Sequence, residues 1–216
     1  MNRAKLEQII VQGVDFEIRA ALDNGWKLFK EKAPLHVGFT FIIIVIQVLF
    51  TLYLEDFLFI FSIFLSPPLV IGFYLAGNKI SQGEWLEFSD FFDGFKYWLP
   101  VVIINLVSSI LAVLGLFALV IPGVYLLIGY MFSLLFGVFG GFEFWASMEL
   151  SRRLVHTNWW KFFALGLVLL LINLLGILTL GIGLFISIPL TYLTVYALFE
   201  ELTSEAAEEP AQPSLD

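Results

Sequence analysis

The chain of 216 residues is 60% apolar and only 14% charged, whereas an ordinary soluble domain is about half apolar and about a quarter charged. The formal net charge is −8, but six of the 19 acidic residues lie within the last 17 residues, so the remainder is nearly balanced and has no basic footprint for nucleic acid. The absence of cysteine excludes disulfides, thiol catalysis and Cys-ligated metal sites.

The first predicted element is an amphipathic segment over 1–34, which is charged and lacks the apolar stretch of a signal peptide. Within it, Leu22, Trp26 and Phe29 fall along one helical face. We expect this segment to lie on the cytoplasmic surface of a membrane rather than cross it.

Six apolar stretches follow within 35–200, each near the length of about 20 residues that a helix needs to span a bilayer. Their runs are continuously apolar rather than alternating, which excludes a closed β-barrel. The sequence therefore predicts an all-α membrane protein whose six transmembrane helices form three helical hairpins. These pair 35–54 with 57–77, 99–120 with 123–141, and the two halves of 162–199, which a glycine-containing turn at 179–183 divides.

The last predicted segment, 201–216, is acidic and poor in large apolar residues, so we expect a disordered tail. All 11 Lys and Arg residues fall on one side of the predicted topology. The positive-inside rule then places both termini in the cytoplasm.

The second and third hairpins align with an offset of 68 residues, which suggests internal repeats. Asn105-Leu106 matches Asn173-Leu174, and Gly115-Leu116-Phe117 matches Gly183-Leu184-Phe185. Glycine and proline residues that we expect to shape the helix ends of the hairpins recur at comparable places: Pro68, Pro122, Gly123 and Pro189.

Three short motifs carry a resemblance to known proteins. They are Gly25-Trp26 with Phe29-Lys30, then Ile121-Pro122-Gly123-Val124-Tyr125, and the run from Trp145 to Arg152. Over most of its length the chain resembles poorly characterised bacterial integral-membrane families, including the membrane domain attached to some glycerophosphodiester phosphodiesterases. The resemblance implies a six-helix protein of the bacterial inner membrane without an assigned reaction, since the catalytic domain of those fusions is absent here.

The most polar residues at depth in the predicted spans are Gln47, Asn105 and Asn173. We expect them to form interhelical hydrogen bonds, and a solute site is the alternative. In the fourth span a stripe of small residues at a spacing of four predicts one close-packed helix face, with Phe139 facing lipid. The stripe comprises Gly129, Ser133, Gly137 and Gly141, and packing within the bundle is favoured over a dimer or partner interface.

Aromatic and basic residues cluster where the predicted spans leave the membrane, as is typical of residues that contact lipid head groups. The candidates are Trp26, Lys27, Lys30, Arg152, Arg153, Trp159, Trp160 and Lys161.

No acid, base or histidine lies near the middle of a predicted span, and no nucleotide loop, zinc-spaced set or nucleophile motif occurs. The sequence therefore favours a non-enzymatic protein without a cofactor or metal: a scaffold, an accessory subunit or a lipid-interacting module. The alternative is a transporter or channel for a small neutral or lipophilic solute. The expected partners are membrane lipids, with a membrane-protein partner or homo-oligomer as a further possibility, and no nucleic acid.

Overall fold

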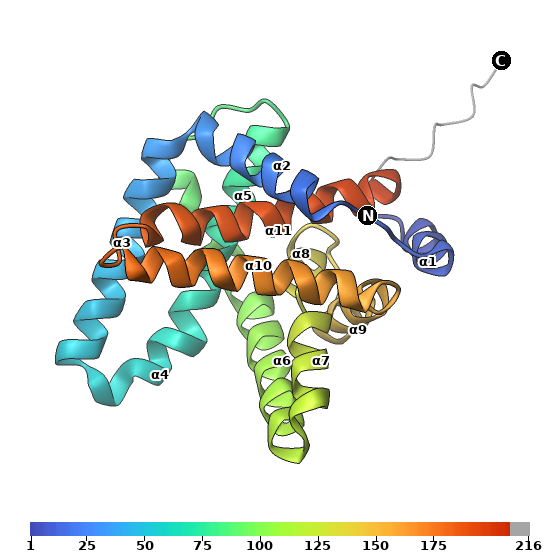
Figure 1. The fold of residues 1–216 in the computed structure, drawn as a ribbon. Helices are drawn as coiled ribbons and strands as arrows, with labels where there is room; N and C mark the ends of the chain where they lie inside the picture. Colours follow the sequence, from blue (N-terminus) through green and yellow to red (C-terminus); the bar gives the residue numbers. More distant parts are fainter. Residues whose placement is uncertain (208–216) are drawn as a thin grey trace.

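A computed structural model describes residues 1–207, which are mostly helical and contain no strand (Figure 1). Six helical stretches are long and apolar enough to cross a membrane, which confirms the predicted fold class. The repeat relation between hairpins stays a prediction. In chain order the elements are α1 (Arg3–Gln12), α2 (Ile18–Glu31), α3 (Ala33–Tyr53), η1 (Glu55–Phe57), α4 (Leu58–Ile60), η2 (Phe61–Leu65), α5 (Ser66–Ser81), η3 (Phe88–Tyr97), α6 (Trp98–Ala118), α7 (Val120–Gly129), α8 (Ser133–Val138), α9 (Phe144–His156), α10 (Trp159–Leu178) and α11 (Leu184–Ala207).

The second span is continuous over 55–81 but changes its helix type along the way. Pro67 and Pro68 stand in the first turn of α5 and have no N–H to donate to the preceding turn. The five residues before α5 form the π-helical turn η2, which accommodates this loss without ending the helix.

The fourth span is not the single helix that was expected over 123–141. α7 ends at Gly129, a turn occupies 130–132, and α8 begins at Ser133. The buried hydroxyl of Ser151 on α9 donates to the Gly129 carbonyl at 2.7 Å and accepts from the Phe132 N–H at 3.0 Å. The break is tolerated within a span because another helix satisfies the freed backbone groups.

The N-terminal segment packs on the bundle, with α2 lying along α11 (Figure 1). Ala21, Gly25 and Phe29 are buried on this face. A Cβ on Gly25 would lie only 2.7 Å from the backbone nitrogen of Thr194, so the two helices meet backbone to backbone. The apolar face of α2 is therefore used at least in part for intramolecular packing.

The expected disorder of the C-terminal tail is wrong for its first part, because α11 continues through 201–207. Thr203 and Ala206 are buried there, and the Asn2 N–H donates to the Ala206 carbonyl at 2.9 Å. This contact ties the two terminal segments together, while 208–216 lie outside the described residues.

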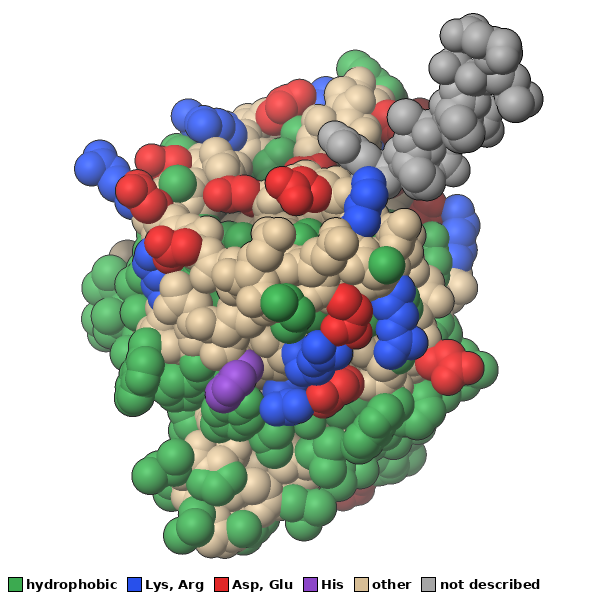
Figure 2. All heavy atoms as spheres, turned by 90° about the vertical axis from the view of Figure 1, so that its right-hand side faces the viewer, with side chains coloured by type: hydrophobic (Ala, Val, Ile, Leu, Met, Phe, Trp, Pro, Cys, Tyr) green, Lys and Arg blue, Asp and Glu red, His purple; other side chains and the backbone are tan. Residues whose placement is uncertain are grey.

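Polar and apolar surfaces separate along the molecule. Figure 2 shows charged side chains over the upper part of one face and mainly hydrophobic ones below. The turns joining α6 to α7 and α10 to α11 carry highly exposed apolar residues, with Phe117 86%, Ile121 82% and Leu180 94% exposed. We refer to these turns as the tips and to the opposite region as the charged end. Apolar side chains as exposed as those of the tips are more stable in hydrocarbon than in water.

Candidate functional site

A pocket of about 160 Å³ with a mixed polar and apolar lining lies between α6 and the break that follows α7. Its polar lining comes from Asn105, Ser108 and Ser109 on α6 and from Tyr130 and Ser133 at the break. Its apolar lining comprises Ala112, Leu127, Met131 and Leu134. The α7 break is what places Tyr130 and Ser133 opposite the α6 amide.

The hydrogen bonds around this pocket leave three polar groups open. The Ser108 and Ser133 hydroxyls donate to carbonyls of their own segments, Ile104 and Tyr130, each at 2.7 Å. By contrast, within the described chain the amide of Asn105 and the hydroxyls of Ser109 and Tyr130 have no hydrogen-bond partner. Asn105 lies seven residues into α6, or about 10 Å along the helix from the charged end. The pocket thus presents an amide about one third of the way along α6.

Asn173, which aligns with Asn105, is fully engaged. Its amide nitrogen donates to the Leu169 carbonyl at 2.9 Å and to the Thr191 hydroxyl at 2.7 Å. Its amide oxygen accepts from Ser187 at 3.0 Å, so it joins α10 to α11. The same residue type therefore serves packing in one hairpin and lines a pocket in the other.

Gln47, the third predicted polar position, is exposed on α3 and does not line the pocket. The structure does not bring Gln47, Asn105 and Asn173 together. They are three separate polar positions rather than one convergent set.

The small-residue stripe does not form one helix face, because the break in the fourth span separates its members. Gly129 ends α7, where its Cβ would lie 3.4 Å from Arg152 Cγ, and buried Ser133 begins α8. On α8, a Cβ on Gly137 would lie 2.5 Å from Ile104 Cδ1 of α6. Gly141 follows α8 with a φ of 67°, which glycine adopts at low cost.

The expectation that Phe139 faces lipid is wrong. Its ring lies 5.6 Å from that of Tyr196 and 6.4 Å from that of Phe199, both on α11. The turn after α8 redirects the chain, which a continuous helix would not do.

The predicted hinge residues occupy different structural positions. Pro122 and Gly123 lie in the first turns of α7, and a Cβ on Gly123 would lie 2.4 Å from Leu116 Cγ across the tip. Pro68 is buried in the first turn of α5. Pro189 lies inside α11, which continues on both sides, so its assignment as a hairpin hinge is wrong.

The basic residues after the fourth span are neutralised by acids. Arg153 forms two hydrogen bonds with Glu7 of α1, at 2.8 and 2.6 Å, and Lys161 pairs with Asp15. Hydrogen bonds from Arg153 and from Lys161 hold the pKa values of the Glu7 and Asp15 carboxyls below their usual ranges. These bases therefore fasten the N-terminal segment to α9 and α10.

Arg152 forms a local network instead. It donates to both Glu149 oxygens, at 2.9 and 2.7 Å, and to the Tyr125 hydroxyl at 3.3 Å. The hydrogen bonds from Arg152 lower the pKa of Glu149. The Tyr125 hydroxyl lies 3.1 Å from His156 Nδ1, so the network joins α7 to α9 beside the break.

The other predicted head-group residues remain accessible to different degrees. Trp160 is 75% exposed, whereas Trp159 stacks on Phe163 with ring centroids 5.1 Å apart. On α2, Trp26 is 36% exposed, and Lys27 and Lys30 are exposed on the same helix. The exposed members remain available for lipid head groups.

The sequence analysis predicts no helix over 144–156, where α9 lies and packs against α6, α7 and α8. A usable signal was present in the apolar and small residues that recur at helical spacing. The buried residues are Ser147, Met148, Leu150, Ser151, Leu154 and Val155.

Among the described residues, no group of three or more His, Cys, Asp or Glu side chains is close enough to hold a metal ion. Comparison with protein-family models, curated proteins and solved structures finds no match. The resemblance to bacterial six-helix membrane families therefore stays a prediction.

Proposed function

We propose that the protein is a non-enzymatic, lipid-interacting protein of the bacterial inner membrane, with both termini in the cytoplasm. In this proposal the Asn105 pocket holds the uncharged polar part of one membrane lipid, its ester carbonyl or glycerol hydroxyl. The supporting observation is the open amide of Asn105 in a membrane span.

Hydrocarbon offers an amide no hydrogen-bond partner. Leaving a buried polar group unpaired costs about 1–3 kcal/mol in typical proteins, and up to several kcal/mol where the surroundings cannot form hydrogen bonds at all. A lipid ester carbonyl would accept from the Asn105 amide, and a glycerol hydroxyl would also serve Tyr130. In this proposal the ester or glycerol group of the lipid reaches Asn105 about 10 Å along α6 from the charged end.

The size and lining of the pocket suit part of a lipid rather than a whole one. A volume of about 160 Å³ is below the roughly 300–1,000 Å³ of pockets that hold a drug-sized ligand. Leu127, on the pocket wall, is 53% exposed and offers an apolar surface along which an acyl chain extends.

A scaffold or accessory role is the competing proposal, favoured by the exposed Gln47 on α3, an amide that a partner helix would satisfy. Transport of a small neutral solute is the other alternative, favoured by the polar lining of the same pocket. The scaffold proposal and the transport proposal each predict experimental results that differ from those expected for lipid binding.

Native mass spectrometry of the purified protein tests the proposal. Wild type should retain one lipid through mild delipidation, Asn105→Leu should lose it, and the matched Gln47→Leu control should keep it. Equal retention by the two variants would contradict lipid binding at Asn105. Flux of neutral solutes into proteoliposomes that Asn105→Leu abolishes would favour transport, and loss of a co-purifying protein in Gln47→Leu would favour the scaffold.

A further inference from the structure

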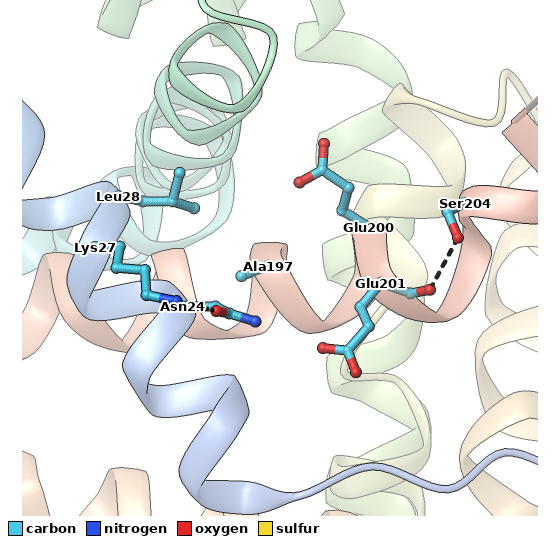
Figure 3. A pocket seen from close by; sticks show the side chains of 7 residues that line it. All are labelled: Asn24, Lys27, Leu28, Ala197, Glu200, Glu201 and Ser204. Carbon is cyan, nitrogen blue, oxygen red and sulfur yellow. Dashed lines mark hydrogen bonds between the residues drawn. The ribbon is translucent and has the colours of Figure 1, made fainter.

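A second pocket, of about 260 Å³, lies at the charged end where α5 and α11 finish. Its lining includes aromatic residues, amide and hydroxyl groups and one carboxylate: Met1, Asn78, Gln82, Phe139, Tyr196, Phe199, Glu200, Thr203 and Ser204. It shares Glu200 and Ser204 with an adjoining pocket between α2 and α11, which Figure 3 shows.

Three aromatic rings form one side of the second pocket. Phe139 contacts the rings of Tyr196 and Phe199, with centroids 5.6 and 6.4 Å apart. Tyr196 and Phe199 are almost fully buried, so packing fixes their orientations. Phe139 is the partly exposed ring of the three, and an aromatic ring attracts a cation, most strongly one with little hydration of its own.

The carboxylate of Glu200 is held in place by hydroxyl groups. Its Oε1 accepts from Ser81 at 2.7 Å and from Tyr196 at 3.0 Å, and the Asn78 amide donates to the same Tyr196 oxygen at 2.9 Å. The hydrogen bonds from Ser81 and Tyr196 both end on Oε1 of Glu200. Within the described residues, its other carboxylate oxygen, Oε2, accepts no hydrogen bond. The site is therefore ordered before any ligand arrives.

No base in the described part of the chain forms an ion pair with Glu200. Lys27, across the adjoining pocket, donates to Asn24 at 3.1 Å instead. Figure 3 shows the carboxylates of Glu200 and Glu201 pointing to opposite sides of α11, so Glu201 does not share the position of Glu200. Among residues 1–207, the Glu200 carboxylate beside these aromatic rings thus has no ion-pair partner.

We propose that this pocket binds a small organic ammonium group, with its positive charge at Glu200 Oε2 and its alkyl part against Phe139, Tyr196 and Phe199. A strongly hydrated metal ion would gain little from the rings, whereas an alkylammonium uses both the rings and the carboxylate. The volume is slightly below the roughly 300–1,000 Å³ of drug-sized ligand sites, as a small ligand requires.

Two sources supply this chemistry at the charged end: an amine-bearing lipid head group and a free alkylamine. The test uses the full chain in nanodiscs, with any tag at the C-terminus because Met1 lines the pocket. Phosphatidylglycerol discs lack amines, and discs containing phosphatidylethanolamine supply the lipid source. Choline and ethanolamine are titrated into both by calorimetry, at constant ionic strength.

We expect saturable binding in phosphatidylglycerol discs, weakened about tenfold or more by Glu200→Gln, which keeps an oxygen for Ser81 and Tyr196. Glu201→Gln is the matched control and should bind as wild type does. Ser204→Phe fills the pocket without altering a charge and should also block binding, so the proposal does not depend on the folding of one variant.

The two sources give different results in the second disc type. Loss of choline binding when phosphatidylethanolamine is present identifies the lipid head group as the occupant, and unchanged binding identifies a free amine. The proposal is overturned if neither amine binds saturably in phosphatidylglycerol discs. It is equally overturned if Glu201→Gln weakens binding as much as Glu200→Gln, since that indicates general charge attraction.

Discussion

Gly25→Ala should release α2 from α11. The new Cβ would lie 2.3 Å from Thr194 Oγ1 and 2.7 Å from the Thr194 backbone nitrogen and Cα, whereas carbon contacts are favourable at about 3.5–4.0 Å. The helices must therefore separate by about 1 Å, which loosens the packing of Ala21 and Phe29. Overpacking of this kind costs about 1–3 kcal/mol, offset by the gain of about 1 kcal/mol for alanine over glycine in a helix.

Gly38→Ala on α3 is the matched control, because its Cβ would lie 3.5 Å from Phe88 Cε2, an ordinary contact. We expect the Gly25 variant to melt at lower temperature in detergent and to be cut faster by trypsin at Lys27 and Lys30, with Gly38→Ala unchanged or more stable. Adding Thr194→Ala should rescue the Gly25 variant only in part, since backbone atoms make two of its three closest contacts. Full stability of Gly25→Ala alone would refute backbone contact between α2 and α11.

The other predictions concern hydrogen bonds and ion pairs that cross between elements. Because the pKa of Glu7 is lowered in the fold, its pair with Arg153 stabilises the protein above the ordinary glutamate pKa of 4.5 and is lost as the pH falls through the lowered value. The rate of amide hydrogen exchange in α1, corrected for intrinsic rates, should rise as the pH falls through the lowered pKa of Glu7. Arg153→Gln should raise this rate already at neutral pH. Equal corrected rates in wild type at neutral pH and below the lowered pKa would contradict the anchoring of α1 by this pair. Ser151→Ala leaves a buried carbonyl and N–H unpaired and should cost about 2 kcal/mol in denaturant unfolding, whereas a cost near zero would show that the break needs no partner. Asn173→Leu should cost about 1–2 kcal/mol while Asn105→Leu costs nothing, and equal losses would remove the distinction between the two amides.

Hydropathy and turn chemistry predicted the six spans well, because spanning a membrane constrains length and composition strongly. The turn at 179–183 was predicted from its glycines. In the structure α10 ends just before this turn, at Leu178, and α11 begins just after it, at Leu184. Gly181 adopts a φ of 81° there, and Thr179 accepts a hydrogen bond from the Gly183 N–H at 2.9 Å. Such local signals are sufficient when the interaction that ends a helix lies within the same few residues.

The candidate site was only partly predictable. The break after Gly129 depends on Ser151, which is 22 residues away in sequence, so the apolar run alone indicated one continuous helix. Likewise, Asn105 and Asn173 occur in similar local sequences, and only the packing of α11 against α10 supplies Asn173 with Ser187 and Thr191. The sequence identified the polar positions, but not which of them would remain open.

The pairing of the basic residues also required the fold. Arg153 and Glu7 are 146 positions apart, so the sequence showed an exposed basic cluster where the structure has ion pairs. The prediction of a head-group surface nevertheless stays a prediction, because an ion pair with an acid does not exclude contact with a head group. The most exposed members of this surface are Trp26, Lys27, Lys30 and Trp160.

The central proposal is that the open amide of Asn105 takes the polar part of a lipid. Structure determination of the protein in nanodiscs prepared from bacterial membrane lipids tests this most directly. The proposal predicts lipid density in the pocket, with an ester or hydroxyl oxygen about 2.7–3.2 Å from the Asn105 amide nitrogen and an acyl chain along Leu127. An empty pocket, or one in which a helix of another protein or a second copy satisfies Asn105, would contradict it.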